Sequence, residues 1–242
     1  METRKETVAI VGAGDYIGAE ICRAFAAEGF TVFAGRRNGD KLAPLVAEIE
    51  AAGGSIVGRS LDARNEAEVT QFIADAEAHG PLEVCVFNVG ANVNYPFVET
   101  TERVFRKVWE MACYAGFLTG REAAKAMLPR KKGCLFFTGA TAGLRGNPGY
   151  AAFASAKFGL RAVAEAAGRE LMPQGIHVAH LIIDSGVDTA WVRARIAEAG
   201  ADSSSRVLMN PASVAQAYIQ LWKQPADAWT FETQIRPSVE PW

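Results

Sequence analysis

The stretch VAIVGAGDYIG, from Val8 to Gly18, decides the fold of this 242-residue chain. A short apolar run with β-branched residues ends at glycines. Apolar positions at helical spacing then run from Ile17 to Phe25, and Gly29 closes the pattern. The stretch therefore predicts a strand, a glycine turn and a helix.

The three glycines of this turn have separate roles in the prediction. Gly12 permits a tight turn, Gly14 lets the backbone approach a ligand closely, and Gly18 lets the helix pack against the strand. The helix start at Tyr16 and Ile17 then offers free N–H groups and a partial positive charge to a pyrophosphate. We therefore expect a dinucleotide here, with an ordinary strand–turn–helix that binds nothing as the alternative.

Composition limits the class of protein. Half of the residues are hydrophobic and the net charge is −2, which is typical of one α/β domain spanning 1–242 with a large core. There is neither a block of charge nor a basic tail, so we expect no nucleic acid and no membrane as partners. No apolar run approaches the roughly 20 residues of a membrane helix, and the charged start does not resemble a signal peptide.

The cysteines indicate the compartment. Cys22, Cys85, Cys113 and Cys134 lie in apolar segments without the spacing of a metal site. We interpret them as reduced core residues of a cytoplasmic protein and expect no metal.

Strand-like runs alternate with helical patterns along the rest of the chain. Further strands are predicted at 30–34, 55–61, 82–87, 134–137, 176–183 and 229–235, and helices at 40–52, 65–78, 101–127, 150–171 and 212–223. This alternation predicts a doubly wound, Rossmann-like parallel sheet of about seven strands with helices on both faces. The segment around 187–210 is either a substrate lid or a loose loop.

The end of the second strand bears on which dinucleotide binds. Dinucleotide folds often carry an acid there to hold the ribose 2′-hydroxyl, whereas this chain has Gly35 and then Arg36 and Arg37. Guanidinium groups suit a 2′-phosphate, so we expect NADP(H) rather than NAD(H); two solvated arginines are the alternative. Asp15 in the glycine turn counts against a nearby phosphate, because like charges repel.

Other polar residues have two interpretations. Asp62, after the third strand, could accept a hydrogen bond from an adenine amino group or cap the helix at 65–78. His177 and His180 lie on an apolar strand and are expected to be hydrogen-bonded core residues. Cys113 as a nucleophile would need an activating base, and none is evident.

Together these pieces resemble the short-chain dehydrogenase/reductase family along the whole chain. The matching positions are Gly12, Gly14, Gly18, Asp62, Asn88-Val89-Gly90, Lys157 and Gly186-Val187-Asp188-Thr189. The resemblance implies a seven-stranded parallel sheet, a nicotinamide cofactor, a small-molecule substrate and a homo-oligomer, dimer or tetramer, packed through the helices at 101–128 and 150–171. It also implies cofactor contacts from Asn88, Gly90, Lys157, Gly186 and Thr189, where Thr189 could instead cap a helix.

The chain departs from the family where the chemistry occurs. The family's reaction uses an asparagine, a serine, a tyrosine and a lysine, but here these positions hold Cys113, Ala140, Phe153 and Lys157. Tyr16 stands where the family usually has a glycine. Phenylalanine has no proton to give and alanine no donor, and a general acid alone contributes ~10²–10⁴ in rate. The usual ketoreductase mechanism is therefore severely weakened.

Tyr150 is a candidate replacement for the missing tyrosine. It lies seven residues before Lys157, two helical turns and ~10 Å along a helix axis, so both side chains project nearly the same way. The spacing is similar to that of enoyl-thioester reductases. The alternative is that Tyr150 only closes the loop at 146–149.

We therefore expect an NADP(H)-dependent oxidoreductase that transfers hydride to or from a small carbonyl or conjugated, enoyl-type substrate. Lys157 and Tyr150 are its catalytic candidates in a degenerate active site, with Tyr150 as the proton donor and Lys157 as its electrostatic partner. The alternative is a catalytically silent NADP(H)-binding sensor or assembly subunit on the same fold.

Overall fold

Seven strands form one sheet in this computed structural model, which describes residues 4–198, 200 and 207–240. The strands are β1 (Thr7–Val11), β2 (Thr31–Arg36), β3 (Ser55–Ser60), β4 (Leu82–Phe87), β5 (Gly133–Ala140), β6 (Ile176–Ile183) and β7 (Glu232–Ile235). All neighbours pair in parallel, in the order β3-β2-β1-β4-β5-β6-β7. The predicted doubly wound parallel sheet is confirmed.

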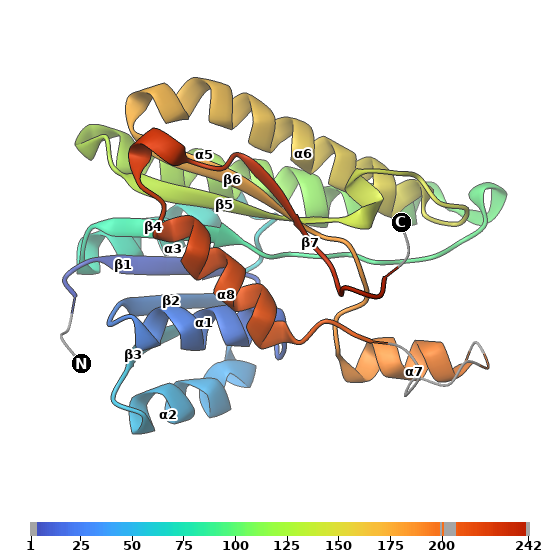
Figure 1. The fold of residues 1–242 in the computed structure, drawn as a ribbon, viewed down its shortest axis with the longest axis horizontal. Helices are drawn as coiled ribbons and strands as arrows, with labels where there is room; N and C mark the ends of the chain where they lie inside the picture. Colours follow the sequence, from blue (N-terminus) through green and yellow to red (C-terminus); the bar gives the residue numbers. More distant parts are fainter. Residues whose placement is uncertain (1–3, 199, 201–206, 241–242) are drawn as a thin grey trace.

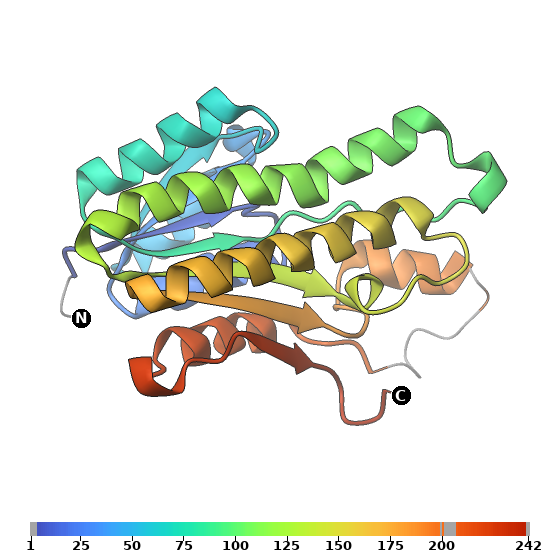
Figure 2. The ribbon, with the colours of Figure 1, turned by 90° about the horizontal axis from the view of Figure 1, so that it is seen from above.

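Helices cover both faces of the sheet. They are α1 (Ile17–Ala27), α2 (Ala43–Ala51), α3 (Glu66–His79), α4 (Glu102–Trp109), α5 (Ala115–Met127), α6 (Ala151–Leu171), α7 (Ala190–Glu198) and α8 (Pro211–Trp222). Figure 1 shows α1, α2 and α8 on one side of the sheet and α5 and α6 on the other. Figure 2, turned by 90°, shows α3, α5 and α6 side by side across the second face.

Strand β1 shows why the strands of this sheet are continuous apolar runs in the sequence. Val8 and Ile10 pack into the core on the α1 and α8 side, while Ala9 and Val11 pack into the core on the α3 and α5 side. All four are fully buried. Successive strand residues point to opposite faces, so a strand covered on both faces needs apolar residues at every position.

Two local features differ from the sequence prediction. The helix predicted at 101–127 is interrupted by a π-helical turn over Glu110–Tyr114, between α4 and α5. Such turns insert one residue into the helical register, which an apolar pattern does not reveal. The cap of α3 is Asn65, whose side chain accepts from the N–H groups of Ala67 and Glu68. The predicted capping role of Asp62 is therefore wrong.

The segment at 187–210 contains helix α7, which the sequence did not predict. Only Ile196 of this helix is buried, so it carries no apolar stripe that a periodicity argument could detect. The loose-loop alternative is wrong over Ala190–Glu198. Residues 199 and 201–206 lie outside the described residues.

The glycine turn supports a paired test of packing. A Cβ atom on Gly18 would lie 2.4 Å from the Gly12 carbonyl oxygen, whereas a Cβ on Gly14 has no neighbour within 4 Å. We expect Gly18→Ala to lower the free energy of unfolding by about 1–3 kcal/mol, because backbone must move to admit the methyl group. Gly14→Ala, the matched control, changes it by less than about 0.5 kcal/mol.

Urea denaturation of the two variants without added ligand measures this difference. Equal midpoints for both variants would show that the close approach of Gly18 to Gly12 does not constrain the fold.

Candidate functional site

Two adjoining cavities lie at the carboxyl edge of the sheet, where parallel sheets of this kind bind ligands. The larger, about 740 Å³, is lined by the ends of β1, β4, β5 and β6 and by α7. The smaller, about 520 Å³, lies at the ends of β2 and β3. Both are lined by Gly12, Gly14, Asn88, Val89 and Gly90, so a ligand of two linked halves could cross from one to the other at the glycine turn.

The glycine turn leaves backbone open to the two cavities. Gly12 has φ +97°, a left-handed conformation that glycine adopts without strain. Gly14 and Gly90 face open space, so backbone is accessible from the cavities. Tyr16 precedes α1 but its side chain does not cap the helix, and Tyr16 and Ile17 line the larger cavity. The first N–H groups of α1 can therefore serve an anion.

The smaller cavity is rich in cationic side chains. Arg36, Arg37, Lys41 and Arg64 line it together with Asp62. A phosphate monoester in this cavity would meet several donors, as the sequence prediction requires.

Arg36 and Arg37 differ in what they contact. The Arg36 guanidinium lies 2.5 Å from the Asp15 carboxylate, which neutralises the acid that the sequence analysis counted against a phosphate. Arg37 is exposed, and among the described residues it has no carboxylate within ion-pair distance, although it lies close enough to Asp62 to lower the pKa of that group. Arg37 is therefore better placed than Arg36 to hold an added phosphate.

Asp62 is an ionised acceptor at the smaller cavity. Its carboxylate accepts from Arg64 at 2.9 Å and 2.5 Å, and this pairing holds the pKa of Asp62 below its ordinary value. With the capping role excluded, the adenine contact remains as the predicted role of Asp62.

Lys157 is the buried cation of the larger cavity. Its side chain, on α6, is 3% exposed, and its Nζ donates to the main-chain oxygens of Thr138 at 2.8 Å and Val89 at 3.3 Å. Burial lowers the pKa of this ammonium from 10.5 to about 8. Two of its three hydrogens are engaged within the protein, so the third is available to a ligand.

The structure places the departures from the family around Lys157. The ring centroid of Phe153, one turn earlier on α6, lies 6.0 Å from Nζ, and Phe153 and Ala140 both line the larger cavity. Neither side chain can give a proton. Cys113 is buried in the π-helical turn, and burial raises the pKa of its thiol. It is therefore a thiol rather than a nucleophilic thiolate.

A buried hydrogen-bond chain, which the sequence analysis did not predict, fixes the edge of the sheet. Asn88 donates to the Gly12 carbonyl at 3.1 Å, and Thr138 donates to Asn88 at 3.1 Å. The hydroxyl of Tyr218, fully buried on α8, lies 2.6 Å from that of Thr138. This chain of hydrogen bonds joins the ends of β1, β4 and β5 to α8, so it holds the backbone of the glycine turn to the core.

Tyr150 lies at the larger cavity, immediately before α6, whereas the sequence analysis made it the first residue of this helix. Its hydroxyl oxygen accepts a hydrogen bond from Arg195 of α7 at 3.2 Å. The cationic partner of this phenol in the structure is therefore Arg195 and not the predicted Lys157, because Lys157 bonds to main-chain oxygens. Sequence reasoning missed Arg195 because it lies on the helix that was not predicted.

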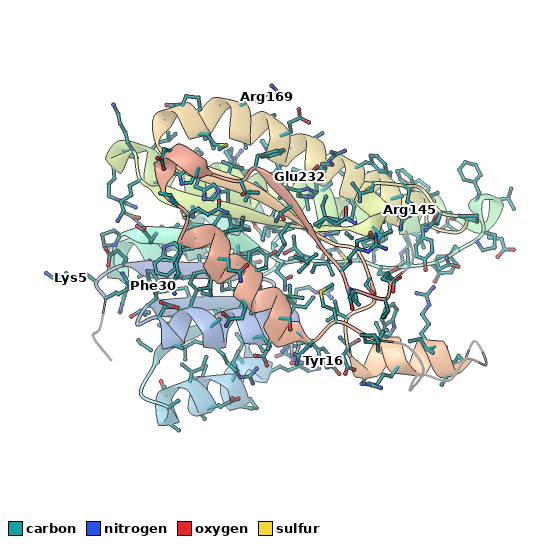
Figure 3. All side chains as sticks on the ribbon, viewed as in Figure 1. Lys5, Tyr16, Phe30, Arg145, Arg169 and Glu232 are labelled. Atoms are coloured by element: carbon teal, nitrogen blue, oxygen red, sulfur yellow. The ribbon has the colours of Figure 1, made fainter. Side chains whose placement is uncertain are left out.

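The start of α7 is tied to the glycine turn. The Tyr16 hydroxyl accepts from the N–H of Ala190 at 3.0 Å, and Figure 3 shows Tyr16 beside the first turn of α7. Thr189 accepts from the N–H of Val192 at 3.1 Å, as a helix cap does, and it also lines the larger cavity together with Gly186. The two predicted roles of Thr189 are thus compatible.

Asp184 is a buried acid at the end of β6 that the sequence analysis did not identify. It is 2% exposed, accepts from Thr141 at 2.6 Å and from Arg145 at 3.3 Å, and is also bonded by Gln234 of β7. These contacts fix the loop after β5, which forms one wall of the larger cavity.

The remaining candidates have structural roles. His177 and His180 are fully buried and bond to the Thr230 carbonyl and the Glu232 carboxylate, which confirms the core interpretation. Within residues 4–198, 200 and 207–240, no group of acids, histidines and cysteines could hold a metal ion. In the same part of the chain, no helix has the length and apolar character needed to cross a membrane.

The buried ammonium makes a prediction about stability and pH. An unfolded lysine has a pKa near 10.5 and Lys157 in the folded protein about 8, so between these values the unfolded chain binds more protons. Stability from this group therefore rises with pH across that window. We expect the free energy of unfolding of the wild type, relative to Lys157→Met, to increase by about 2 kcal/mol from pH 8 to pH 10.

Chemical denaturation of both proteins at matched pH values measures this difference, in which other titrating groups cancel. A difference that stays constant over this range would show that Lys157 titrates as an exposed lysine does.

Sequence comparisons relate the chain to known proteins. The family model described as short chain dehydrogenase matches residues 6–200. A short-chain dehydrogenase/reductase of Armillaria gallica is 32% identical over 173 residues, which cover 70% of this chain and 66% of that protein.

Solved structures match nearly the full length. A short-chain dehydrogenase from Rhodopseudomonas palustris is 66% identical, with a TM-score of 0.85, and the match covers 97% of this chain and 99% of that one. A variant of the actinorhodin polyketide ketoreductase, crystallised with NADPH, is 26% identical, with a TM-score of 0.87 and 97% of each chain covered.

Proposed function

The chain belongs to the short-chain dehydrogenase/reductase family, and from this premise we propose that it is an NADP(H)-dependent oxidoreductase acting on a small carbonyl or conjugated, enoyl-type substrate. The observation that carries the proposal is the pair of cavities joined at the glycine turn, with the buried Lys157 ammonium in one and Arg37 in the other. Among the described residues, Arg37 has no carboxylate within ion-pair distance. When bound, the nicotinamide group supplies or accepts the hydride.

The residues present fit this cofactor. Gly12, Gly14, Tyr16, Ile17 and Gly18 offer open backbone and the start of α1 to the pyrophosphate. Toward the adenosine half, Arg37 and Arg36 suit the 2′-phosphate and Asp62 the adenine amino group. The nicotinamide half would lie beside residues of the larger cavity: Asn88, Gly90, Lys157, Gly186 and Thr189. Lys157 can donate its third hydrogen to the ribose hydroxyls.

Tyr150 is the proposed proton donor. Its oxygen already accepts from Arg195, so the phenolic hydrogen is free to be donated to a substrate oxygen. The guanidinium also favours the negative charge that the phenol gains as it releases the proton. Phe153 and Ala140 cannot take this part.

The same two side chains favour a second candidate, a catalytically silent NADP(H)-binding sensor or assembly subunit. Phe153 fills the position one turn from Lys157 and brings an apolar ring to the cavity. In that function the cofactor would bind without hydride transfer.

We also propose a substrate lid, an oligomeric state and a cellular compartment, as the family resemblance implies. Helix α7, tethered through Tyr16, would act as the substrate lid. Large apolar side chains that are 40–42% exposed on α4, α5 and α6 would pack in a homodimer or homotetramer: Phe105, Trp109, Phe117 and Phe158. The four free, buried thiols suit the reducing cytoplasm.

Arg37 is expected to determine the choice of cofactor. Arg37→Ala removes a charge-assisted partner of the 2′-phosphate, so we expect NADPH to bind about 10-fold or more weakly while NADH binding stays within about twofold. Fluorescence titrations with NADPH and, separately, with NADH measure the two affinities. Arg59→Ala, on the exposed end of β3, serves as the control.

Equal losses for NADPH and NADH would show that Arg37 does not read the 2′-phosphate.

Tyr150 is tested by removing one oxygen. We expect Tyr150→Phe to lower kcat about 10²–10⁴-fold with the best substrate of a carbonyl and enoyl panel, because the proton donor is lost, while NADPH binding is kept. Tyr95→Phe, a tyrosine whose side chain is 44% exposed, is the matched control. Steady-state NADPH oxidation is the measurement, and unchanged turnover in Tyr150→Phe would remove Tyr150 from the mechanism.

The panel also separates the two candidate functions. Tight NADPH binding without turnover of any compound by the wild type favours the silent protein. Activity gained by the double variant Ala140→Ser with Phe153→Tyr would then show that only those groups are missing.

A further inference from the structure

The guanidinium of Arg195 is held in the wall of the larger cavity by two aromatic side chains. Its Cζ lies 5.9 Å from the ring centroid of Tyr150 and 5.3 Å from that of Trp191, and Nη2 donates to the Tyr150 hydroxyl at 3.2 Å. The residue is half-buried. The two aromatic contacts and the hydrogen bond restrict the position of the guanidinium, which favours recognition of a ligand in one orientation.

The other arginines of this cavity region have acidic partners. Arg145 pairs with Asp184, and Arg193, two residues from Arg195 on α7, pairs with Asp188. Among the described residues, no carboxylate lies within ion-pair distance of Arg195.

Among residues 4–198, 200 and 207–240, the acids of this region form no ion pair with Arg195. Glu198, one turn later on α7, is exposed and forms no ion pair with Arg195, and the Glu240 carboxylate at the larger cavity accepts from Ser185 at 3.2 Å. A guanidinium has five N–H donors, and within the described part of the chain the Tyr150 hydroxyl is the one acceptor that Arg195 contacts. A half-buried cation with donors to spare is suited to an anionic ligand.

We propose that Arg195 binds a carboxylate of the substrate, so that the substrates are short oxo acids and the corresponding hydroxy acids. The inference rests on the proposed function, because it uses Tyr150 as the group that meets the reacting oxygen. In reduction, the carbonyl carbon gains the hydride of NADPH, the carbonyl oxygen gains the Tyr150 proton, and the carboxylate on Arg195 is unchanged. Solvent returns the proton to Tyr150.

The geometry limits the length of the acid. A carbonyl oxygen bonded to Tyr150 and a carboxylate oxygen bonded to Arg195 are separated by two hydrogen bonds and the 3.2 Å contact between the two side chains. Allowing for the bends, these oxygens lie roughly 4–8 Å apart. This separation suits 3-oxo and 4-oxo acids better than 2-oxo acids, whose oxygens lie closer together.

The first test compares an acid with its neutral ester. NADPH oxidation is measured with 4-oxopentanoate and with its methyl ester, for the wild type, Arg195→Gln, Arg195→Lys and the control Arg193→Gln. We expect the wild type and the control to prefer the acid at least about 10-fold in kcat/KM, through a lower KM. Arg195→Gln should bring the acid-to-ester ratio to near one, and Arg195→Lys should restore part of it.

A wild type that shows no preference for the acid, or an Arg195→Gln variant that keeps the wild-type ratio, would overturn the inference. Because a ratio is compared within each protein, a general loss of rate in a variant does not imitate the expected result.

A second test does not depend on turnover. Isothermal titration of the NADP⁺-saturated protein with pentanoate and, separately, with pentanamide compares the affinities for a charged and a neutral ligand of the same chain length. We expect pentanoate to bind at least about 10-fold more tightly in the wild type and equally to pentanamide in Arg195→Gln. Equal binding of the two ligands in the wild type contradicts the inference.

The two tests separate this inference from the proposed function. Pentanoate held through Arg195 without reduction of any oxo acid or any compound of the carbonyl and enoyl panel would support the anion site and contradict the proposed activity. Reduction of neutral ketones, with the same acid-to-ester ratio in the wild type and in Arg195→Gln, would support the proposed activity and contradict the anion site.

Discussion

A buried ammonium must have acceptors, and the acceptors of Lys157 organise the candidate site. The main-chain oxygens of Thr138 and Val89 lie at the ends of neighbouring strands, so bonding both fixes α6 against the edge of the sheet. The same edge is braced by the chain from Tyr218 through Thr138 and Asn88 to the glycine turn. Burial lowers the pKa of Lys157, so the site holds this cation at a cost in stability.

Two aromatic residues that precede Lys157 in the chain, Phe153 and Tyr150, line the larger cavity. An apolar ring, Phe153, occupies the turn of α6 next to Lys157, whereas the phenol of Tyr150 stands at the start of that helix. The phenol takes its cationic partner from α7 in the form of Arg195. In this account Lys157 holds the cofactor, while Tyr150 and Arg195 meet the substrate. The proton donor is then complete only when α7 lies over the cavity.

Most of the fold could be predicted from the sequence, because strands buried on both faces are continuous apolar runs that alternate with helical patterns. The prediction failed where tertiary contacts decide. Helix α7 has one buried residue, so it showed no pattern and concealed Arg195. The capping role went to Asn65 instead of Asp62. The pairing of Arg36 with Asp15 joins residues far apart in the chain. Because this pairing neutralises the Asp15 carboxylate, Asp15 no longer argues against a nearby phosphate.

The central claim is that a phosphate-bearing nicotinamide cofactor crosses the glycine turn, with one half beside Lys157 and the other beside Arg37. Isothermal titration calorimetry of the unmodified protein with NADPH, and separately with NADH, tests it most directly. The account predicts heat and a Kd of about 10 μM or tighter for NADPH, with NADH at least about 10-fold weaker. Absence of heat with both cofactors, or equal affinity for the two, would contradict it.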